Sequence, residues 1–428
     1  MKKPAKEVYW YTLKKPKPVH LDRDLVVDIV VVGGGMAGLM CAQRIRRDNK
    51  NLKVVVVEAG ICGAGASGKS SGFITPDSEL ELSDLVKEYG EEKAKKLWDF
   101  VKKGVTSIKE TIQRRNLPCD FSVQDSLYVA NDQKGYKKVE AEFRAQKKAG
   151  YNAFLFDEKR IKSILGTDTY MGGVRTKDTF GMISYLYCQE LKESLQRDSM
   201  AIYEETPVTE ITPVGIRTEK FIIQADKVVV CTDRFLPDFN IAKDEVYHAQ
   251  TFLAISEPLP HASVNALFPN APVMVWDTDL IYQYYRLVEG NRLLLGSSSI
   301  VHTYNKNESS YTDGILRKMY RYLKEKFPHV PVHFEYMWGG LIGVSKDFLP
   351  IAGRDPVNKN MFFIGACAGL PWAASLGEYI ADKILEGRDE FDEVFSPSRK
   401  FPLGKNAQVI LRKPLTFALS HGIKKYFK

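Results

Sequence analysis

Short runs of β-branched residues alternate with amphipathic segments along the chain. The first run, residues 29–32, is followed by three glycines at G-x-G-x-x-G spacing and then by the helix-compatible segment 39–47. This order predicts a strand, a tight turn and a helix. A second run, residues 54–57, ends in an acid and predicts the next strand of a parallel sheet. The amino-terminal part of the chain is therefore expected to form a βαβ unit.

The glycine spacing is typical of a turn that holds a dinucleotide diphosphate. Gly33 allows the sharp turn, Gly35 lets a pyrophosphate approach the backbone, and Gly38 lets the helix pack closely on the sheet. Glu58 follows Gly38 by 20 residues, where a ribose-binding acid is expected. The alternative is an α/β turn that binds no nucleotide.

Residues 60–73 are rich in glycine, alanine and serine. Such a stretch cannot fill a core, but it supplies backbone N–H groups, hydroxyls and the ammonium of Lys69. We expect it to form a second contact surface for the diphosphate. The alternative is a flexible loop.

The remaining pattern predicts helices and strands in turn. The expected helices are 79–116, 134–150, 180–197, 309–327 and 371–385, and the expected strands are 121–130, 227–231, 246–256, 273–276, 280–288, 292–298 and 362–364. Nucleotide-domain character is thus interrupted by insertions and resumes near the end of the chain.

The expected fold class is α/β: a Rossmann-type βαβ domain interleaved with an α+β substrate domain built on an antiparallel sheet. The nucleotide domain is expected to comprise residues 24–120, 181–240 and 336–393, and the substrate domain residues 121–180 and 241–335. Residues 1–23 and 394–428 are expected to be basic terminal arms.

Charge is unevenly distributed. The net charge is +8, but residues 24–393 carry 46 basic and 51 acidic side chains, whereas residues 394–428 carry eight basic and no acidic ones. The amino terminus has no apolar signal core, and no apolar run is long enough to span a bilayer. We expect a cytoplasmic protein whose basic tail either contacts the inner membrane face or packs on the body.

The six cysteines lie far apart, with no C-x-x-C pair and no histidines at metal spacing. Neither a disulfide framework, a structural zinc site nor any other metal site is predicted.

These motifs, in this order, resemble the D-amino-acid-oxidase-like (DAO) superfamily of FAD-dependent amine and amino-acid oxidoreductases, and within it the γ-glutamylputrescine oxidase-like branch. The resemblance rests on Tyr9-Trp10, the strand and glycine turn at 28–35, Gly65-Ala66-Ser67-Gly68 before Gly72-Phe73, Cys231-Thr232-Asp233, Ser256-Glu257-Pro258-Leu259, Tyr284-Tyr285-Arg286, Arg292-Leu293-Leu294-Leu295-Gly296, Trp338-Gly339-Gly340, Asp347 and Leu349-Pro350. It implies a fold of the DAO/glutathione-reductase-2 type.

The resemblance also implies the FAD-binding residues. The diphosphate, ribose, adenine and flavin contacts would come from Gly33, Gly35, Met36, Ala37, Gly38, Glu58, Ala59, Ala66, Ser67, Gly72, Phe73, Val208, Thr232, Gly365, Gly369, Leu370 and Pro371. The helix that begins near Pro371 would direct its partial positive charge at the reduced flavin.

Two departures from relatives shape the expectation. Relatives often have a Gly-x-Gly-like turn with histidine before the last helix, whereas this chain reads Gly369-Leu370-Pro371-Trp372, so its flavin face is expected to be more apolar. The second departure concerns oxygen activation and covalent attachment. Sarcosine-oxidase-type members carry an oxygen-activating lysine where Leu294 stands here, and a covalent cysteine near residues 341–345, where this chain has none. Noncovalent FAD is therefore expected, and the electron acceptor, O2 or another molecule, stays open.

The candidate catalytic residues are Tyr284, Arg286 and Trp338. Tyr282, Tyr284 and Arg286 alternate along one predicted strand and so share a face, where a guanidinium beside two phenols would suit a carboxylate-bearing amine. The alternative is a half-buried strand in which the two tyrosines make ordinary aromatic packing contacts and Arg286 is solvated. Trp338 and Trp372 are either an aromatic cage for an amine or core residues.

The expected function is oxidation of a C–N bond in an amine or amino acid: a hydride passes from the substrate α carbon to flavin N5, and the imine is then hydrolysed. The alternative is a tRNA-modifying or membrane-associated FAD dehydrogenase of the same fold. Nucleic acid is the less favoured partner, because no recognised binding module accompanies the basic ends.

Overall fold

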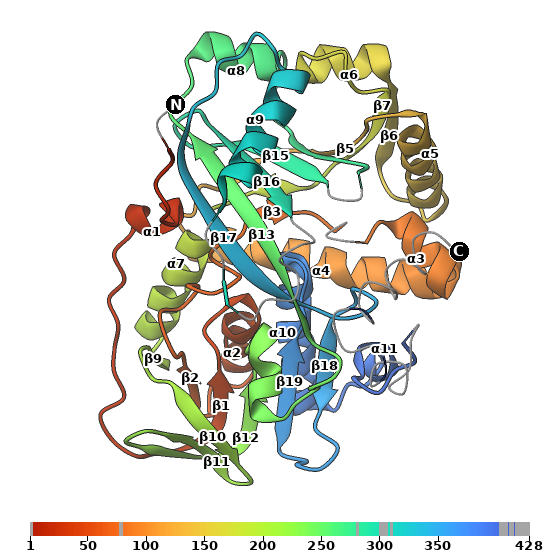
Figure 1. The fold of residues 1–428 in the computed structure, drawn as a ribbon. Helices are drawn as coiled ribbons and strands as arrows, with labels where there is room; N and C mark the ends of the chain where they lie inside the picture. The colour runs from red at the N-terminus through yellow and green to blue at the C-terminus, as the bar shows by residue number, and fades with distance from the viewer. Residues whose placement is uncertain are drawn as a thin grey trace.

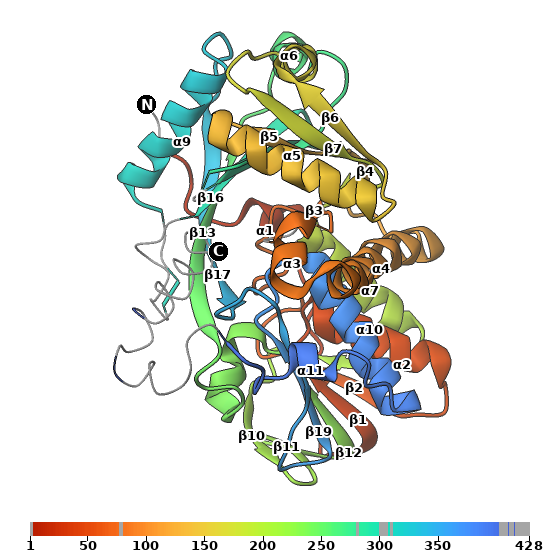
Figure 2. The same ribbon diagram turned by 90° about the vertical axis from the view of Figure 1, so that its right-hand side faces the viewer.

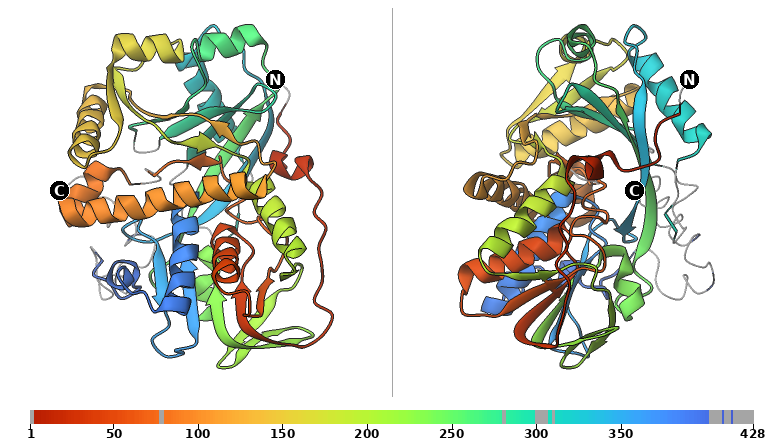
Figure 3. Two further views of the ribbon diagram at one scale, coloured as in Figure 1. Left: turned by 180° about the vertical axis from the view of Figure 1, so that it is seen from behind. Right: turned by 90° about the vertical axis from the view of Figure 1, so that its left-hand side faces the viewer.

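The computed structural model describes residues 3–76, 80–279, 282–298, 307–308, 311–401, 410 and 415. Two large sheets lie one above the other, and the long helix α4 (Glu91–Arg115) crosses between them (Figures 1 and 3). Each sheet collects strands from distant parts of the chain, so the two halves of the molecule are interleaved in sequence.

The lower sheet has the strand order β10-β11-β12-β1-β2-β9, and β19 pairs with both β12 and β18. Strands β9, β2, β1, β12 and β19 run parallel to one another, so their carboxyl ends meet at one edge. The strand bounds are β1 (Leu25–Val32), β2 (Val54–Val57), β9 (Ala201–Tyr203), β10 (Val208–Thr212), β11 (Gly215–Thr218), β12 (Ile222–Val230), β18 (Ile351–Arg354) and β19 (Met361–Gly365).

Both faces of this sheet are buried, which explains the continuous valine runs. In β1, Ile29 and Val31 pack toward the helices, whereas Val30 and Val32 belong to the core on the opposite face. The helices on the first face are α2 (Met36–Asp48), α7 (Ser184–Arg197), α10 (Leu370–Glu386), α4 and α3 (Leu82–Tyr89). Gly377 lets α10 approach α2, because a Cβ there would lie 2.5 Å from the Ala37 carbonyl oxygen.

The upper sheet has the strand order β17-β13-β16-β15-β14-β5-β7-β6 and is antiparallel except between β14 and β5. Its bounds are β5 (Ser126–Ala130), β6 (Ala153–Asp157), β7 (Gly172–Thr176), β13 (Tyr247–Ser256), β14 (Met274–Asp277), β15 (Gln283–Val288), β16 (Arg292–Ser298) and β17 (Phe334–Val344). The surrounding helices are α5 (Gln133–Lys148), α6 (Glu158–Leu165), α8 (His261–Leu267) and α9 (Asp313–Lys326) (Figure 2).

A small sheet joins the two halves. It has the order β3-β8-β4 and consists of β3 (Phe73–Ile74), β8 (Phe180–Gly181) and β4 (Ser122–Val123). The other short elements are α1 (Tyr9–Leu13), the 3-10 helix η1 (Asp233–Phe239) and α11 (Asp392–Phe395).

The α/β fold class predicted from the sequence is confirmed, and several boundaries differ. The helix expected over 79–116 is broken at Gly90, whose φ of 77° suits glycine and separates α3 from α4. The helix expected from 180 starts at Ser184, because residues 180–181 pair as β8 in the small sheet. The strand expected over 121–130 is two strands, β4 and β5.

The domain boundaries expected from the sequence stay proposals, and β17 crosses one of them. The strand continues past residue 336 because it pairs with β13 over residues 334–344. Within the expected carboxyl-terminal arm, Arg399 forms a two-pronged ion pair with the buried Asp347. Beyond residue 401, only the exposed Ile410 and Leu415 of that arm belong to the described residues. No helix in the described part of the chain is long and apolar enough to cross a membrane.

Candidate cofactor and substrate site

The carboxyl ends of four parallel strands of the lower sheet bring four of the sequence-predicted cofactor residues to one edge. Gly33 follows β1, Glu58 follows β2, Thr232 lies just beyond β12, and Gly365 ends β19. Ligands of open α/β sheets bind outside this edge. The topology therefore assembles one site from residues more than 300 positions apart in sequence.

The glycine turn after β1 leaves no room for side chains. Gly33 has φ of 111°, and a Cβ there would lie 2.4 Å from the carbonyl oxygen of Cys231. A Cβ on Gly38 would lie 1.9 Å from the Gly33 carbonyl oxygen. Both positions therefore need glycine, the first for its backbone conformation and the second for the close approach of α2.

The amino terminus of α2 faces the small-residue loop. Gly35 caps the helix without a side-chain bond, and the N–H of Met36 donates to Ser67 Oγ at 3.0 Å. A Cβ on Gly35 would lie 3.0 Å from the same oxygen. Free amides and the helix dipole favour an anion here, and Ser67 adds a hydroxyl. Ala66 and Ala37 lie beside these groups in sequence and are both half-buried.

Glu58 holds two turns of backbone together at the end of β2. Its carboxylate accepts hydrogen bonds from the N–H groups of Gly34 at 2.7 Å and Gly60 at 2.9 Å. Burial raises the pKa of Glu58, and these two N–H groups oppose the rise. The backbone of Thr206 pairs with Glu58, donating its N–H to the Glu58 carbonyl oxygen. This contact places the start of β10, at Val208, near the ribose-side acid, while Ala59 is exposed.

The turn after β19 leads into α10. Ala366 and Gly369 have φ values of 53° and 130°, and α10 begins at Leu370 with Pro371 in its first turn, as the sequence predicts. Gly369 caps the helix without a side-chain hydrogen bond. Because α2 follows β1 and α10 follows β19, both helices begin at the carboxyl-end edge of the lower sheet, and the first N–H groups of each have no partner within the helix.

Asp233 is a site residue that sequence reasoning did not select. Its carboxylate accepts the N–H of Gly343 in β17 at 2.8 Å and the N–H of Cys367 at 3.1 Å. Burial raises the pKa of Asp233, and these bonds counter that effect. One carboxylate therefore ties the upper sheet to the turn before α10. Its position beside Thr232, three residues beyond the end of β12 and at the start of η1, was the available signal.

The three candidate catalytic residues all reach the segment 69–73 from the upper sheet. The Trp338 indole N–H donates to the Lys69 carbonyl oxygen at 3.1 Å. The Arg286 guanidinium donates to the Ser71 carbonyl oxygen at 2.8 Å. The Tyr284 ring packs edge-on against Phe73, with ring centroids 5.7 Å apart. This face of the upper sheet is therefore turned toward the small-residue segment 60–73, the predicted flavin loop.

Arg286 is neither solvated nor free to bind a substrate carboxylate as the sequence suggested. It is completely buried and also donates to the carbonyl oxygens of Met182 at 2.7 Å and Leu287 at 3.2 Å. Burial lowers its pKa to about 10. A Cβ on Gly72 would lie 1.7 Å from the Met182 carbonyl oxygen, so Arg286 and Gly72 share this tight corner. Arg286 therefore acts as a structural brace: its hydrogen bonds hold the loop at Ser71 against the Met182 backbone.

The aromatic residues divide into two groups. Trp338 packs with Trp10, whereas Trp372 of α10 packs with Phe100 of α4 and Phe395 of α11. The two tryptophans therefore form no common cage. Beside Tyr284, the aromatic surface consists of Phe73, Trp276, Tyr128 and Tyr282.

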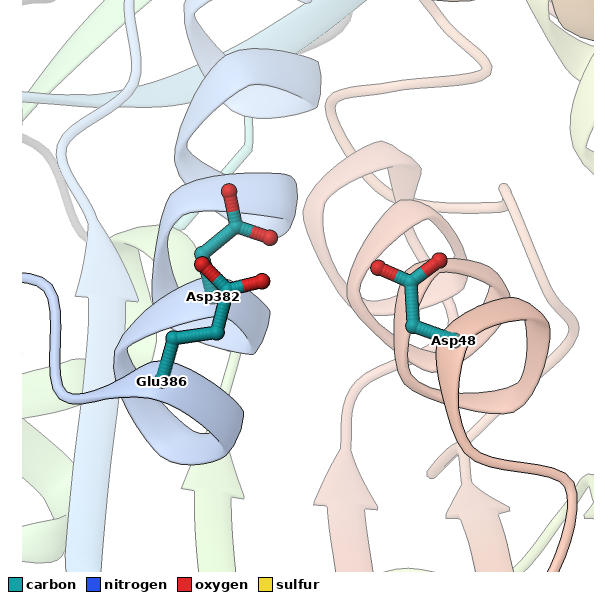
Figure 4. A group of neighbouring side chains, drawn as sticks. All are labelled: Asp48, Asp382 and Glu386. Atoms are coloured by element: carbon teal, nitrogen blue, oxygen red, sulfur yellow. The ribbon is translucent and has the colours of Figure 1, made fainter.

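Away from this edge, Asp48, Asp382 and Glu386 gather between α2 and α10 with carboxylate oxygens within 4.8 Å (Figure 4). Arg44 Nε lies 2.7 Å from Asp382 and 3.0 Å from Asp48, and Arg388 Nε lies 2.8 Å from Glu386. Each of the three carboxylates thus already has a cationic partner. The cluster is therefore an ion-pair network.

Comparison with known proteins agrees with this geometry. The family model "DAO: FAD dependent oxidoreductase" matches residues 28–383. The chain is 27% identical over 384 residues to "Probable oxidoreductase OrdL" of Haemophilus influenzae, which covers 86% of this chain and 85% of that protein. It is 26% identical over 400 residues to gamma-glutamylputrescine oxidoreductase of Escherichia coli, with 91% of each chain covered.

Solved structures share the fold. Glycine oxidase from Geobacillus kaustophilus superposes with a TM-score of 0.75 at 16% identity, over 89% of this chain and 100% of that one. L-proline dehydrogenase from P. horikoshii superposes with a TM-score of 0.74 at 17% identity, over 88% and 98%. The resemblance inferred from the sequence motifs is confirmed: the chain belongs to the DAO family of FAD-dependent oxidoreductases.

Proposed function

We propose that this protein oxidises a C–N bond of an amine or amino acid with noncovalently bound FAD. The observation that carries the proposal is the meeting of two surfaces. The phosphate-type glycine turn, Glu58 and the α10 terminus lie at one edge of the lower sheet, and the aromatic face of the upper sheet is turned toward the same loop. The names of the relatives, which denote oxidoreductases of amines and amino acids, support the same class.

The residues at the edge fit FAD. Thr232 Oγ1 is buried and has no hydrogen-bond partner within the described part of the chain, although buried hydroxyls are normally satisfied. The α2 terminus with Ser67 suits the diphosphate, and Glu58 suits the ribose hydroxyls. Bound FAD supplies the hydride acceptor.

The chain's own residues would orient the amine and exclude water. Phe73 and Tyr284 present an aromatic surface on which the substrate α carbon is held in place, and the half-buried Tyr284 carries a hydroxyl for polar contact. The α10 terminus stabilises the negative charge that accumulates at the site during reduction. The substrate leaves as an imine, which water hydrolyses to a carbonyl compound and an amine or ammonia.

Gly296 offers a selective test of the aromatic surface. A Cβ there would lie 2.0 Å from the Tyr284 ring, so Gly296→Ala must displace that ring. We expect kcat/KM to fall roughly 10-fold or more, because a small misplacement of an orienting group is costly, while FAD affinity stays unchanged. Steady-state kinetics and flavin fluorescence titration measure the two quantities.

Gly314→Ala is the matched control for this change. The nearest atom to a Cβ there is Thr312 Oγ1 at 3.6 Å, an ordinary contact in α9. If Gly296→Ala and Gly314→Ala have the same kcat/KM, Tyr284 does not orient the substrate.

Product analysis tests the reaction. The purified protein is incubated in air with polyamines, γ-glutamyl amines, sarcosine-like amines and D- and L-amino acids, with and without an artificial electron-accepting dye. A carbonyl product together with hydrogen peroxide identifies an oxidase, and a carbonyl product only when the dye is present identifies a dehydrogenase. No carbonyl product from any C–N compound would count against the proposed function.

A further inference from the structure

The amino-terminal arm, residues 3–14, lies against the predicted flavin loop. Trp10 is completely buried, and its indole N–H donates to the Ser70 carbonyl oxygen at 3.1 Å. The hydroxyl of Tyr11 donates to the Ala64 carbonyl oxygen at 2.6 Å. The arm precedes the region matched by the family model, which starts at residue 28, and it was expected from the sequence to be a basic terminal extension.

Three consecutive carbonyls of the loop are held by side chains that can only donate. Lys69 is held by Trp338, Ser70 by Trp10 and Ser71 by Arg286. Indole and guanidinium groups accept no hydrogen bonds, so the direction of these contacts cannot reverse. Two of the three donors come from the upper sheet, and the middle one comes from the arm.

The donors support one another. The Trp10 and Trp338 rings meet nearly edge to face, with centroids 5.5 Å apart and an interplanar angle of 75°. Edge-to-face aromatic pairs contribute beyond their buried area. Displacing Trp10 would therefore disturb the contact of Trp338 with the loop as well as its own.

Both ends of the arm are anchored. At its start, Ala5 exchanges backbone hydrogen bonds with β17, donating to Glu335 and accepting from Met337. At its end, Lys14 pairs with Glu190 and Glu193 of α7 at 2.6 and 3.0 Å. The arm then descends along one side of the molecule to β1 (Figure 1). It thus bridges the upper sheet and a helix of the lower half across the loop.

The loop buries little apolar surface of its own and is held by hydrogen bonds. One of them comes from Ser184 of α7, which donates to the Ser67 carbonyl oxygen at 2.6 Å. Residues 63–72 are mainly glycine, alanine and serine, whose ordering costs conformational entropy without burying much apolar surface. The same loop brings Ser67 to the amino terminus of α2, where the diphosphate is expected. Whatever holds the loop therefore also shapes the diphosphate site.

We propose that the amino-terminal arm is a clamp for the cofactor site, with Trp10 and Tyr11 as positioning residues. The arm holds the loop in the conformation that receives FAD, so arm docking and FAD binding stabilise each other. This coupling is reciprocal, because a ligand that favours the docked arm must bind more tightly when the arm is docked. The inference rests on the proposed noncovalent binding of FAD.

The experiment uses the full-length chain stripped of flavin and titrated with FAD by fluorescence. Trp10→Phe keeps an aromatic ring beside Trp338 but leaves the Ser70 carbonyl without its donor, and Tyr11→Phe does the same to Ala64. We expect the dissociation constant for FAD to rise about 10-fold in each variant. Tyr170→Phe is the matched control, because the Tyr170 hydroxyl bonds to Tyr322 within the upper domain. It should lower the melting temperature and leave FAD affinity unchanged.

Hydrogen exchange provides the reciprocal readout. FAD should slow exchange of the Ala5 amide and its neighbours in the wild type, and less so in Trp10→Phe. A loss of stability alone would lower the melting temperature without this coupling. The clamp is overturned if the wild-type protein binds FAD and both variants bind FAD with the wild-type affinity. It is also overturned if FAD leaves the hydrogen exchange of the arm unchanged. A wild-type chain that binds no FAD overturns the proposed function as well.

Discussion

Gly38→Ala is expected to yield a protein that purifies without flavin. The added methyl group would lie 1.9 Å from the Gly33 carbonyl oxygen, and Gly33 is itself fixed against the Cys231 carbonyl by its φ of 111°. Neither backbone can retreat without opening the turn that receives the diphosphate. A penalty of about 3 kcal/mol, at the upper end for overpacking, corresponds to roughly a 100-fold weaker FAD complex. The ratio of flavin to protein absorbance and a fluorescence titration measure the loss.

Gly314→Ala is also the control for this prediction. Gly314 lies in α9, away from the cofactor residues, and the nearest atom to a Cβ there is Thr312 Oγ1 at 3.6 Å. It should bind FAD like the wild type. Equal affinity in Gly38→Ala and Gly314→Ala would show that the glycine turn is not the diphosphate site.

Arg286→Met is expected to cost about 3 kcal/mol or more of unfolding free energy and to weaken FAD binding. The substitution keeps a long apolar side chain but leaves the carbonyls of Ser71 and Met182 without the guanidinium, whereas the Leu287 carbonyl keeps the Gln124 side chain as a donor. Each buried acceptor left unsatisfied costs about 1 to 3 kcal/mol. Urea unfolding of the flavin-free protein measures the first effect, and FAD titration the second.

Arg175→Met serves as the comparison, since Arg175 forms a partly exposed ion pair with Asp125 and its loss should cost at most about 1 kcal/mol. The two roles considered for Arg286 also predict different kinetics. A brace affects amines with and without a carboxylate alike, whereas a carboxylate ligand raises KM only for carboxylate-bearing substrates. Normal stability of Arg286→Met with such a selective rise in KM would restore the role first expected from the sequence.

The local parts of the site were predictable because their signals are local. Strand, glycine turn and helix follow one another around Gly33 and Gly38, and Glu58 directly follows the next strand, so the spacing along the chain predicted their positions. The proline near the start of α10 likewise identified the beginning of that helix at Pro371. These features depend on backbone conformation within a few residues, which sequence pattern records.

The contacts between distant segments were not predictable. Alternation along β15 correctly put Tyr284 and Arg286 on one face, but it could not show that the guanidinium meets Ser71 and Met182 from two other segments. The contacts of Asp233 and Trp10 were unpredictable for the same reason, since each side chain hydrogen-bonds to backbone groups more than 50 positions away in sequence. Their roles depend on how the two sheets and the arm pack, and packing leaves no fixed spacing in the sequence.

Anaerobic mixing of the FAD-loaded protein with amines and amino acids tests the central claim most directly. The flavin absorbance band is followed while each class of C–N compound is added, first with ordinary hydrogen and then with deuterium on the α carbon. We predict that one class bleaches the flavin and that deuterium slows the bleaching, because the α hydrogen leaves in that step. A flavin that binds at this site and is bleached by no amine or amino acid would contradict the proposed reaction.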